Sequence, residues 1–145
     1  MLGLDILYTS PFARTIETAQ AVLRCFSTPP PLRVTCDLAE TLTFAHNNYH
    51  NTTIHPKLLE QLAMDGIVYP ESDQHVHERC QKFIATLNTA KFANALVISH
   101  AGLIQVFTAL LCPKLGRCDL GYCDVVCFEQ HDDDWIFISS PEVKK

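Results

Sequence analysis

The sequence predicts an α/β fold with a mainly parallel sheet flanked by helices. Short apolar segments typical of strands alternate along the chain with longer segments whose apolar residues recur at helical spacing. Prolines, glycines and polar residues separate these segments, and two strand-like segments follow one another at the C-terminal end. Alternation of strands and helices is typical of parallel sheets, because parallel strands need a crossover connection.

The first half of the chain predicts a strand over 4–9 and a helix over 11–25. Pro11 suits the first turn of a helix, where its missing N–H group would have no partner. The three consecutive prolines within 27–31 exclude a helix and predict a loop. The segment 32–38 is a further strand candidate.

A polar, histidine-rich insert comes next, and a short helix over 57–66 ends at Gly66. Ser72 is placed to cap a helix over 73–89, because a serine side chain can accept a hydrogen bond from a free N–H group of the first turn. The apolar face expected for this helix consists of Val76, Cys80, Phe83, Ile84 and Leu87.

The last third predicts a buried strand over 93–100, a helix over 101–112 that stops before Pro113, and a hairpin formed by 122–130 and 134–140. No internal repeat or low-complexity linker interrupts the chain. We therefore expect one domain over residues 1–145.

The charge composition of the sequence disfavours two classes of binding partner. Lys and Arg total 11 against 16 Asp and Glu, a formal charge of −5, which disfavours nucleic acid and anionic membrane surfaces. No apolar run approaches the roughly 20 residues that a membrane span requires. The seven cysteines are odd in number, and Cys25, Cys80 and Cys127 fall in apolar patterns. We expect mostly buried, reduced thiols in an intracellular, cytoplasmic protein.

Two junctions between strand and helix carry residues suited to bind an anion. Ser10 and Arg14 follow the first strand, and His100 ends the strand over 93–100. Ligands of open α/β sheets bind beyond the carboxyl ends of the strands, so these three side chains are expected to converge there. A guanidinium offers a planar fork of donors to phosphate oxygens, and an imidazole can donate to the same oxygens. Ser10 could instead cap the helix.

The segments "TSPFARTIETA", "PESDQHVHER" and "ALVISHAG" resemble, in this order, motifs of the histidine phosphatase superfamily, which has the phosphoglycerate mutase-like fold. The resemblance covers nearly the whole chain. It implies phosphomonoester hydrolysis through a phosphohistidine, with no metal or organic cofactor. The residues that match are Ser10, Pro11, Arg14, Thr18, Ala19, Pro70, Glu71, Ser72, Arg79 and His100. A minor departure is Ala101, which stands between His100 and Gly102 and resembles a variant of eukaryotic members of the signalling-phosphatase kind.

The resemblance also implies roles for individual residues. Arg14 and His100 would bind the phosphate, with Ser10 as a further donor. Glu40 resembles the general acid that protonates the leaving oxygen, a contribution of about 10²–10⁴ in rate. The implied partner is a phosphorylated small molecule or a phosphoprotein.

One motif of the family does not occur. Its first strand ends in Arg-His-Gly, whose histidine attacks phosphorus, and no arginine of this sequence is followed by histidine. The sequence therefore resembles a member truncated at its N-terminus, without the first strand and helix. We expect a fragment or an incomplete gene model that is inactive alone, or else a short isoform without catalysis. Removal of a central strand would leave strand edges that a second copy or a partner chain could cover.

Other chemistries fit the sequence less well. His46, His50 and His55 lie in the irregular insert without cysteine or carboxylate at ligand spacing, and His75 and His77 point two ways on a helix, so we expect no metal site. Cys112 and Arg117 are one residue too close for a cysteine phosphatase. The alternative function is a pseudo-phosphatase, a scaffold or protein-interaction module.

Overall fold

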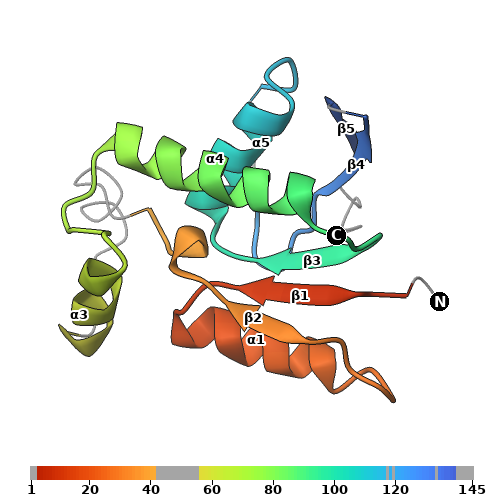
Figure 1. Cartoon of the computed structure of the whole chain (residues 1–145), viewed down its shortest axis with the longest axis horizontal. Coiled ribbons are helices and arrows are strands. Elements are labelled where there is room, and N and C mark those ends of the chain that lie inside the picture. The colour runs from red at the N-terminus through yellow and green to blue at the C-terminus, as the bar shows by residue number, and fades with distance from the viewer. Residues whose placement is uncertain (1–2, 42–55, 117, 119, 133, 140–145) are drawn as a thin grey trace.

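The parallel sheet at the centre of the molecule has three strands in the order β2-β1-β3 (Figure 1). The computed structural model describes residues 3–41, 56–116, 118, 120–132 and 134–139. Strand β1 spans Ile6–Thr9, β2 spans Leu32–Val34 and β3 spans Ala95–Ile98. Both pairs of strands are parallel. The predicted α/β class with a mainly parallel sheet and flanking helices is confirmed.

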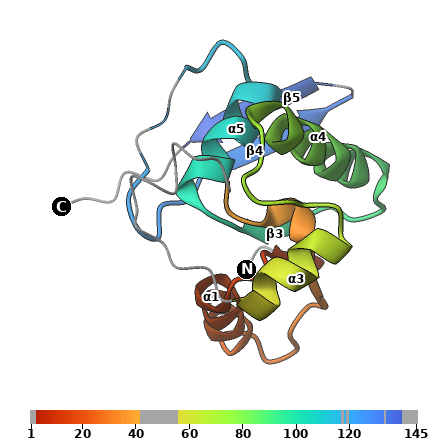
Figure 2. The same ribbon diagram turned by 90° about the vertical axis from the view of Figure 1, so that its left-hand side faces the viewer.

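Two layers of helix enclose this sheet. Helix α1, Ala13–Leu23, lies on one side of it, whereas α4, Asp73–Thr89, and α5, Ala101–Leu111, lie on the other side (Figure 1). Helix α3, Pro56–Met64, lies beyond the carboxyl ends of the strands (Figures 1 and 2). Its Leu62 packs there against Phe12 and Ala39. The helices thus frame the edge of the sheet at which the candidate residues were expected.

The main core lies between the sheet and the helix pair α4 and α5. Phe83 of α4 is 2% exposed and makes edge-to-face contacts with Tyr8 of β1 and Phe107 of α5. Edge-to-face geometry adds to the stabilisation from burial, because the positive ring edge meets a negative ring face. Of the predicted apolar face of α4, Val76, Cys80 and Phe83 are buried, and Ile84 and Leu87 pack against the cluster.

The ends of the helices follow predicted signals in two places. Ser72 Oγ accepts a hydrogen bond from the N–H of His75 at 3.1 Å and so caps α4. Gly66 follows α3 with φ of +82°, a left-handed conformation that glycine adopts without a Cβ clash. At α1 the prediction was too long, because the helix begins at Ala13 and Pro11 precedes its N-cap, Phe12.

The segment 32–38 is only partly a strand. Pairing ends at Val34, and Cys36–Leu38 form a short 3₁₀-helix, η1. The cause is local, because the side chain of Thr35 accepts a hydrogen bond from the N–H of Asp37 and folds the chain out of the sheet. This turn directs Glu40 towards the carboxyl ends of β1 and β3.

The predicted hairpin is confirmed as β4, Cys127–His131, paired antiparallel with β5, Asp134–Ser139. It forms a two-stranded sheet of its own. Strand β3 was predicted to be buried, but Ala95 is exposed and the other three side chains are only half-buried. The reason is its place at the edge of the three-stranded sheet, where it pairs on one side with β1.

The cysteines are all free thiols, and the expectation of burial is wrong for Cys25 and Cys127, which are exposed. Cys25 lies beyond the end of α1, and Cys127 begins the exposed strand β4. Cys80 is buried, as predicted, and so is Cys36.

Burial raises the pKa of Cys36 and Cys80 to about 12, with Asp65 contributing at Cys36. We therefore expect iodoacetamide at pH 8 to alkylate the exposed thiol of Cys25 and to spare these two, because the thiolate is the reacting form. Peptide mass mapping measures this pattern, and the same reaction in urea should label all thiols.

The buried thiols of Cys36 and Cys80 hold their protons in the folded state at pH values where the unfolded chain loses them. Stability should therefore fall as pH rises above about 9. Rapid alkylation of Cys80 in the folded protein would contradict the structure.

Within the described ranges, no helix combines the length and the apolar character needed to cross a membrane.

Candidate active site

The residues predicted at the two strand–helix junctions lie together at the carboxyl ends of β1 and β3. Ser10 directly follows β1, and its N–H donates to the carbonyl of Ile98, the last residue of β3. Arg14 is in the first turn of α1, and His100 is the N-cap residue of α5. Parallel pairing of the two strands therefore brings together groups that are far apart in the sequence.

Arg14 and His100 are in direct contact. The Arg14 Nη2 atom lies 2.7 Å from His100 Nδ1 and 3.2 Å from Glu40 Oε2. The same carboxylate oxygen lies 3.3 Å from His100 Nδ1. The His100 side chain is 2% exposed and that of Glu40 is 11%, whereas that of Arg14 is 51% exposed. A solvent-facing guanidinium thus covers a buried imidazole and a buried carboxylate.

The neighbours of the two ring nitrogens of His100 favour different protonation states of the imidazole. Arginine can only donate, so in the Arg14 contact Nδ1 of His100 is the acceptor and the imidazole is neutral. The proton then sits on Nε2, which donates to Ser10 Oγ at 2.8 Å. Protonation of Nδ1 would exchange this arrangement for an ion pair with Glu40. The site can therefore hold either a neutral or a charged imidazole, according to which neighbour Nδ1 faces.

The Ser10 side chain does not cap helix α1, which was one of its two expected roles. A helix-capping role is wrong, because the N-cap of α1 is Phe12 and no side chain caps it. The Ser10 hydroxyl bonds the imidazole of His100 instead, and it accepts a long bond of 3.4 Å from the N–H of Phe12. Thr15 fixes this turn, since its hydroxyl is within hydrogen-bond distance of the carbonyls of Ser10 and Phe12.

Phe12 contributes to the site and was missed by sequence reasoning. Its buried ring makes an edge-to-face contact with the His100 ring at 4.9 Å between centroids. The guanidinium of Arg14 lies over the same ring, 4.9 Å from its centroid. A cation over an aromatic face is attracted by the ring quadrupole. The Phe12 ring therefore helps to hold the Arg14 guanidinium and the His100 imidazole in place. An aromatic residue inside the Ser-Pro-x-x-Arg stretch is the only sequence signal for this role.

Glu40 reaches the site through the turn that follows η1. The Ser99 hydroxyl donates to the carbonyl of Leu38, which ties this turn to the end of β3. The second carboxylate oxygen of Glu40 accepts the N–H of Thr41 at 3.0 Å. The carboxylate is thereby held towards Arg14 and His100.

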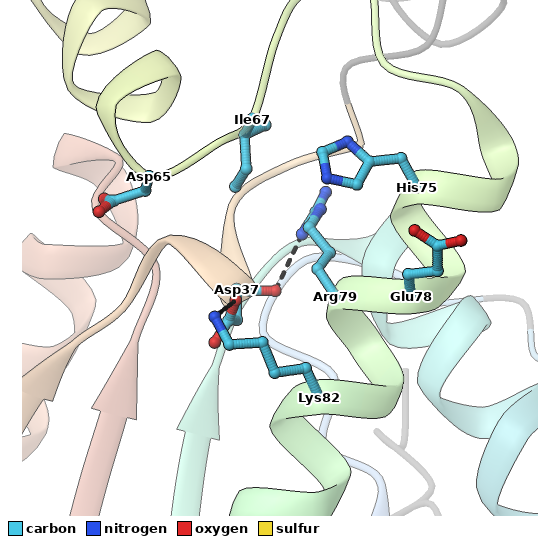
Figure 3. A pocket seen from close by; sticks show the side chains of 7 residues that line it. All are labelled: Asp37, Asp65, Ile67, His75, Glu78, Arg79 and Lys82. Atoms are coloured by element: carbon cyan, nitrogen blue, oxygen red, sulfur yellow. Dashed lines mark hydrogen bonds and ion pairs between the residues drawn. The ribbon is translucent and has the colours of Figure 1, made fainter.

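A hollow of about 160 Å³ lies behind this turn, on the side of α4 (Figure 3). None of Ser10, Arg14, Glu40 and His100 lines it. The residues that line the hollow are Asp37, Asp65, Ile67, His75, Glu78, Arg79 and Lys82.

His75 and His77 have contacts of their own, away from Arg14 and His100. His75 lies 3.5 Å from Glu71, and His77 Nδ1 contacts the carbonyl of Asp73, both within α4 and its N-terminal turn. Among the described residues, no three histidine, cysteine or carboxylate side chains are arranged to hold a metal ion. His46, His50 and His55 lie outside the described residues.

A family model decides the relationship that the motifs indicated. The model of the histidine phosphatase superfamily (branch 1) matches residues 2–140. The chain belongs to the histidine phosphatase superfamily. This assignment confirms the resemblance drawn from the three motifs. No curated protein matches the histidine phosphatase domain at a significant level.

The solved structures confirm the fold of this histidine phosphatase domain. It is similar to the crystal structure of a proposed alpha-ribazole-5'-P phosphatase from Escherichia coli, with a TM-score of 0.65 and 19% identity. The match covers 96% of this chain and 73% of the other. The phosphoglycerate mutase-like fold predicted from the sequence is therefore confirmed.

Proposed function

We propose that Arg14 and His100 bind the phosphate group of a phosphomonoester and that Glu40 serves as the general acid for its leaving oxygen. The observation that carries this proposal is the convergence of a guanidinium, an imidazole and a carboxylate within 3.3 Å of one another. Membership of the superfamily supports the reaction class. The substrate class is a phosphorylated small molecule or a phosphoprotein.

The proposed chemistry proceeds in two displacements at phosphorus. A histidine nitrogen attacks phosphorus while the ester P–O bond breaks, and the leaving oxygen takes the proton of Glu40. Water then attacks the phosphohistidine and loses its proton to Glu40, which releases inorganic phosphate. In this proposal a bound dianion takes the place of Glu40 beside Arg14. Arg14 and His100 stabilise the charge that develops on the phosphate oxygens.

The attacking histidine is proposed to come from outside these 145 residues, because the sequence contains no Arg-His-Gly. We therefore expect this chain to bind phosphate without turnover when it is alone. Incubation with a ³²P-labelled phosphomonoester, followed by a rapid quench, should trap no phosphoprotein. An in-frame Arg-His-Gly segment encoded upstream, if added, should restore labelling. An acid-labile phosphoenzyme formed by the 145 residues alone would overturn this assignment of the nucleophile.

A second candidate function is a pseudo-phosphatase that serves as a scaffold or protein-interaction module. It is favoured by the absence of the Arg-His-Gly motif, whereas the presence of Arg14 and His100 favours catalysis. The half-exposed apolar side chains of β3 favour the pseudo-phosphatase too, because an edge strand is a template for pairing with another chain. Sedimentation over a range of concentrations tests whether a second copy covers this edge. Phosphate release by the protein with its upstream segment would reject this candidate.

The seven free thiols support an intracellular location, since reducing compartments keep cysteines unpaired.

A further inference from the structure

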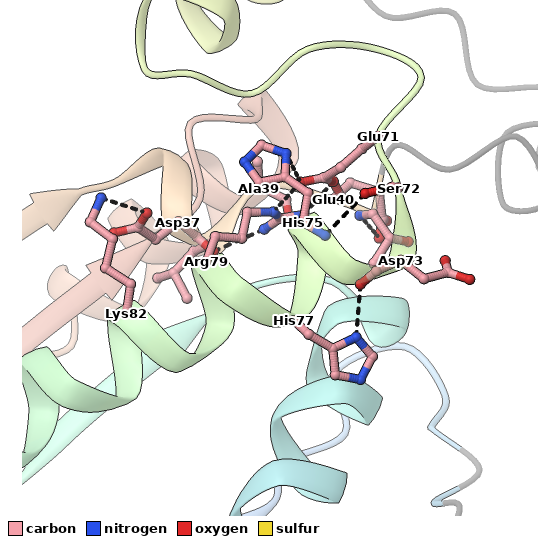
Figure 4. Close-up of polar contacts among 12 residues, drawn as sticks. Asp37, Ala39, Glu40, Glu71, Ser72, Asp73, His75, His77, Arg79 and Lys82 are labelled. Atoms are coloured by element: carbon pink, nitrogen blue, oxygen red, sulfur yellow. Dashed lines mark hydrogen bonds and ion pairs between the residues drawn. The ribbon is translucent and has the colours of Figure 1, made fainter.

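Arg79 of α4 is buried and fully hydrogen-bonded. It is 4% exposed, as is its partner Glu71. The pair is bidentate, with Nε donating to one carboxylate oxygen at 2.7 Å and Nη2 donating to the other at 3.0 Å (Figure 4). A buried guanidinium paired in this planar geometry holds one orientation.

The remaining donors of Arg79 bind the backbone that leads to the active site. Nη1 donates to the carbonyls of Asp37 and Ala39 at 2.9 and 2.8 Å, and Nη2 donates to the carbonyl of Glu40 at 3.0 Å (Figure 4). All five N–H groups of the guanidinium thus have acceptors. Two of those acceptors, the carbonyls of Ala39 and Glu40, belong to the turn after η1, and the third, the carbonyl of Asp37, lies within η1.

We propose that Arg79 is a positioning residue that orients the Glu40 carboxylate towards His100 and Arg14. The inference rests on the proposed function of Glu40 and deepens it. The carbonyl of Glu40 is bound by Arg79, while its carboxylate contacts His100 at 3.3 Å. Because Arg79 of α4 holds the backbone of Glu40, a shift of the Glu40 carbonyl would also move its carboxylate relative to His100.

Lysine cannot replace this arrangement. Its ammonium is a single point with three donors, whereas the guanidinium spreads five donors over a plane. Lys82, which lies near Arg79 on α4, provides a matched control. It bonds the side chain of Asp37 at 3.1 Å, and its own side chain is exposed (Figure 3). It contacts the same turn without holding the backbone.

The experiment follows the His100 ring by NMR as a function of pH in the full 145-residue chain. Within the part of the chain that the structure describes, charged groups that contact this ring are Glu40 and Arg14, and the Ser10 hydroxyl bonds its other nitrogen. Loss of a nearby negative charge makes the charged imidazole less favourable. Glu40→Gln should therefore lower the midpoint of protonation by about one pH unit. Arg79→Lys should lower the midpoint of His100 protonation by a similar amount. In the double variant with Glu40→Gln, Arg79→Lys should cause no further shift. Lys82→Gln should leave the midpoint unchanged.

The outcomes separate the role of Arg79 from folding and from the proposed function. A folded Arg79→Lys protein with the wild-type midpoint overturns the positioning role, and so does a midpoint that Glu40→Gln leaves unchanged. If Arg79→Lys does not fold, Glu71→Gln, which removes one acceptor of the guanidinium, should shift the midpoint in the same direction. An unchanged midpoint there also overturns the role. Inorganic phosphate is titrated separately, and failure of the wild type to bind it rejects the proposed function but leaves the midpoint result standing.

Discussion

Replacement of Arg14 by alanine is expected to weaken binding of inorganic phosphate by about 10- to 100-fold. A hydrogen bond to a charged group contributes about 1.5–3 kcal/mol, and each 1.4 kcal/mol is a factor of ten. Among the described residues brought together at the site, Arg14 is the only arginine, and its exposed side chain is proposed to bind the incoming dianion. Isothermal titration calorimetry, or ³¹P NMR for weak binding, measures the loss.

Arg24→Ala is the matched control for this experiment. Arg24 follows the same helix as its C-cap residue and is exposed, so its loss removes one positive charge without touching the site. Phosphate affinity should stay within about twofold of wild type in this variant, because exposed charges are screened by salt. Equal losses in both variants would show that phosphate responds to overall charge, and the Arg14 assignment would then be wrong. Undiminished hydrolysis of an aryl phosphate by an active form that carries Arg14→Ala would also contradict it.

Phe83→Ala is expected to lower the free energy of unfolding by about 3–5 kcal/mol, a loss that leaves many small domains unfolded at room temperature. The ring is buried between the sheet and α5 and contacts two other aromatic rings. Its removal leaves a cavity that rigid neighbours fill only in part. Urea denaturation followed by circular dichroism measures the change in midpoint.

Tyr122→Ala provides the comparison, because it truncates an aromatic side chain that is fully exposed. We expect its unfolding free energy to lie within about 0.5 kcal/mol of wild type. If Phe83→Ala were as mild as Tyr122→Ala, the packing of α4 on β1 described above would be incorrect.

The sequence was sufficient for most elements, because their signals are local. Glycine predicted where α3 stops, serine predicted where α4 starts, and the apolar spacing of α4 predicted its buried face. The turn at Thr35 was missed because a strand-like pattern continues through Cys36, and the deciding hydrogen bond involves a side chain. Exposure of Cys25 and Cys127 was missed because hydrophobic pattern does not tell whether a neighbouring element covers a residue.

Only the part of the site that follows from the arrangement of the strands could be predicted from the sequence. Arg14 and His100 were brought together by one rule, that the carboxyl ends of parallel strands share an edge. Glu40 was selected by family resemblance, and its approach depends on Arg79 in a helix well beyond it in the sequence. Phe12 acts by packing between two groups, which no spacing rule reports. Its role could only be recognised from coordinates.

The register of the central sheet bears on the order in which the molecule folds. Leu7 pairs with Leu32 across a short stretch of chain, whereas Ile6 pairs with Ala95 only after most of the chain has been made. Because closure of a longer loop costs more entropy and slows folding, we expect β2 to join β1 early and β3 to join late. Arg14 and Glu40 would then come into contact before His100 reaches them. The contact of all three side chains would form only in the native state.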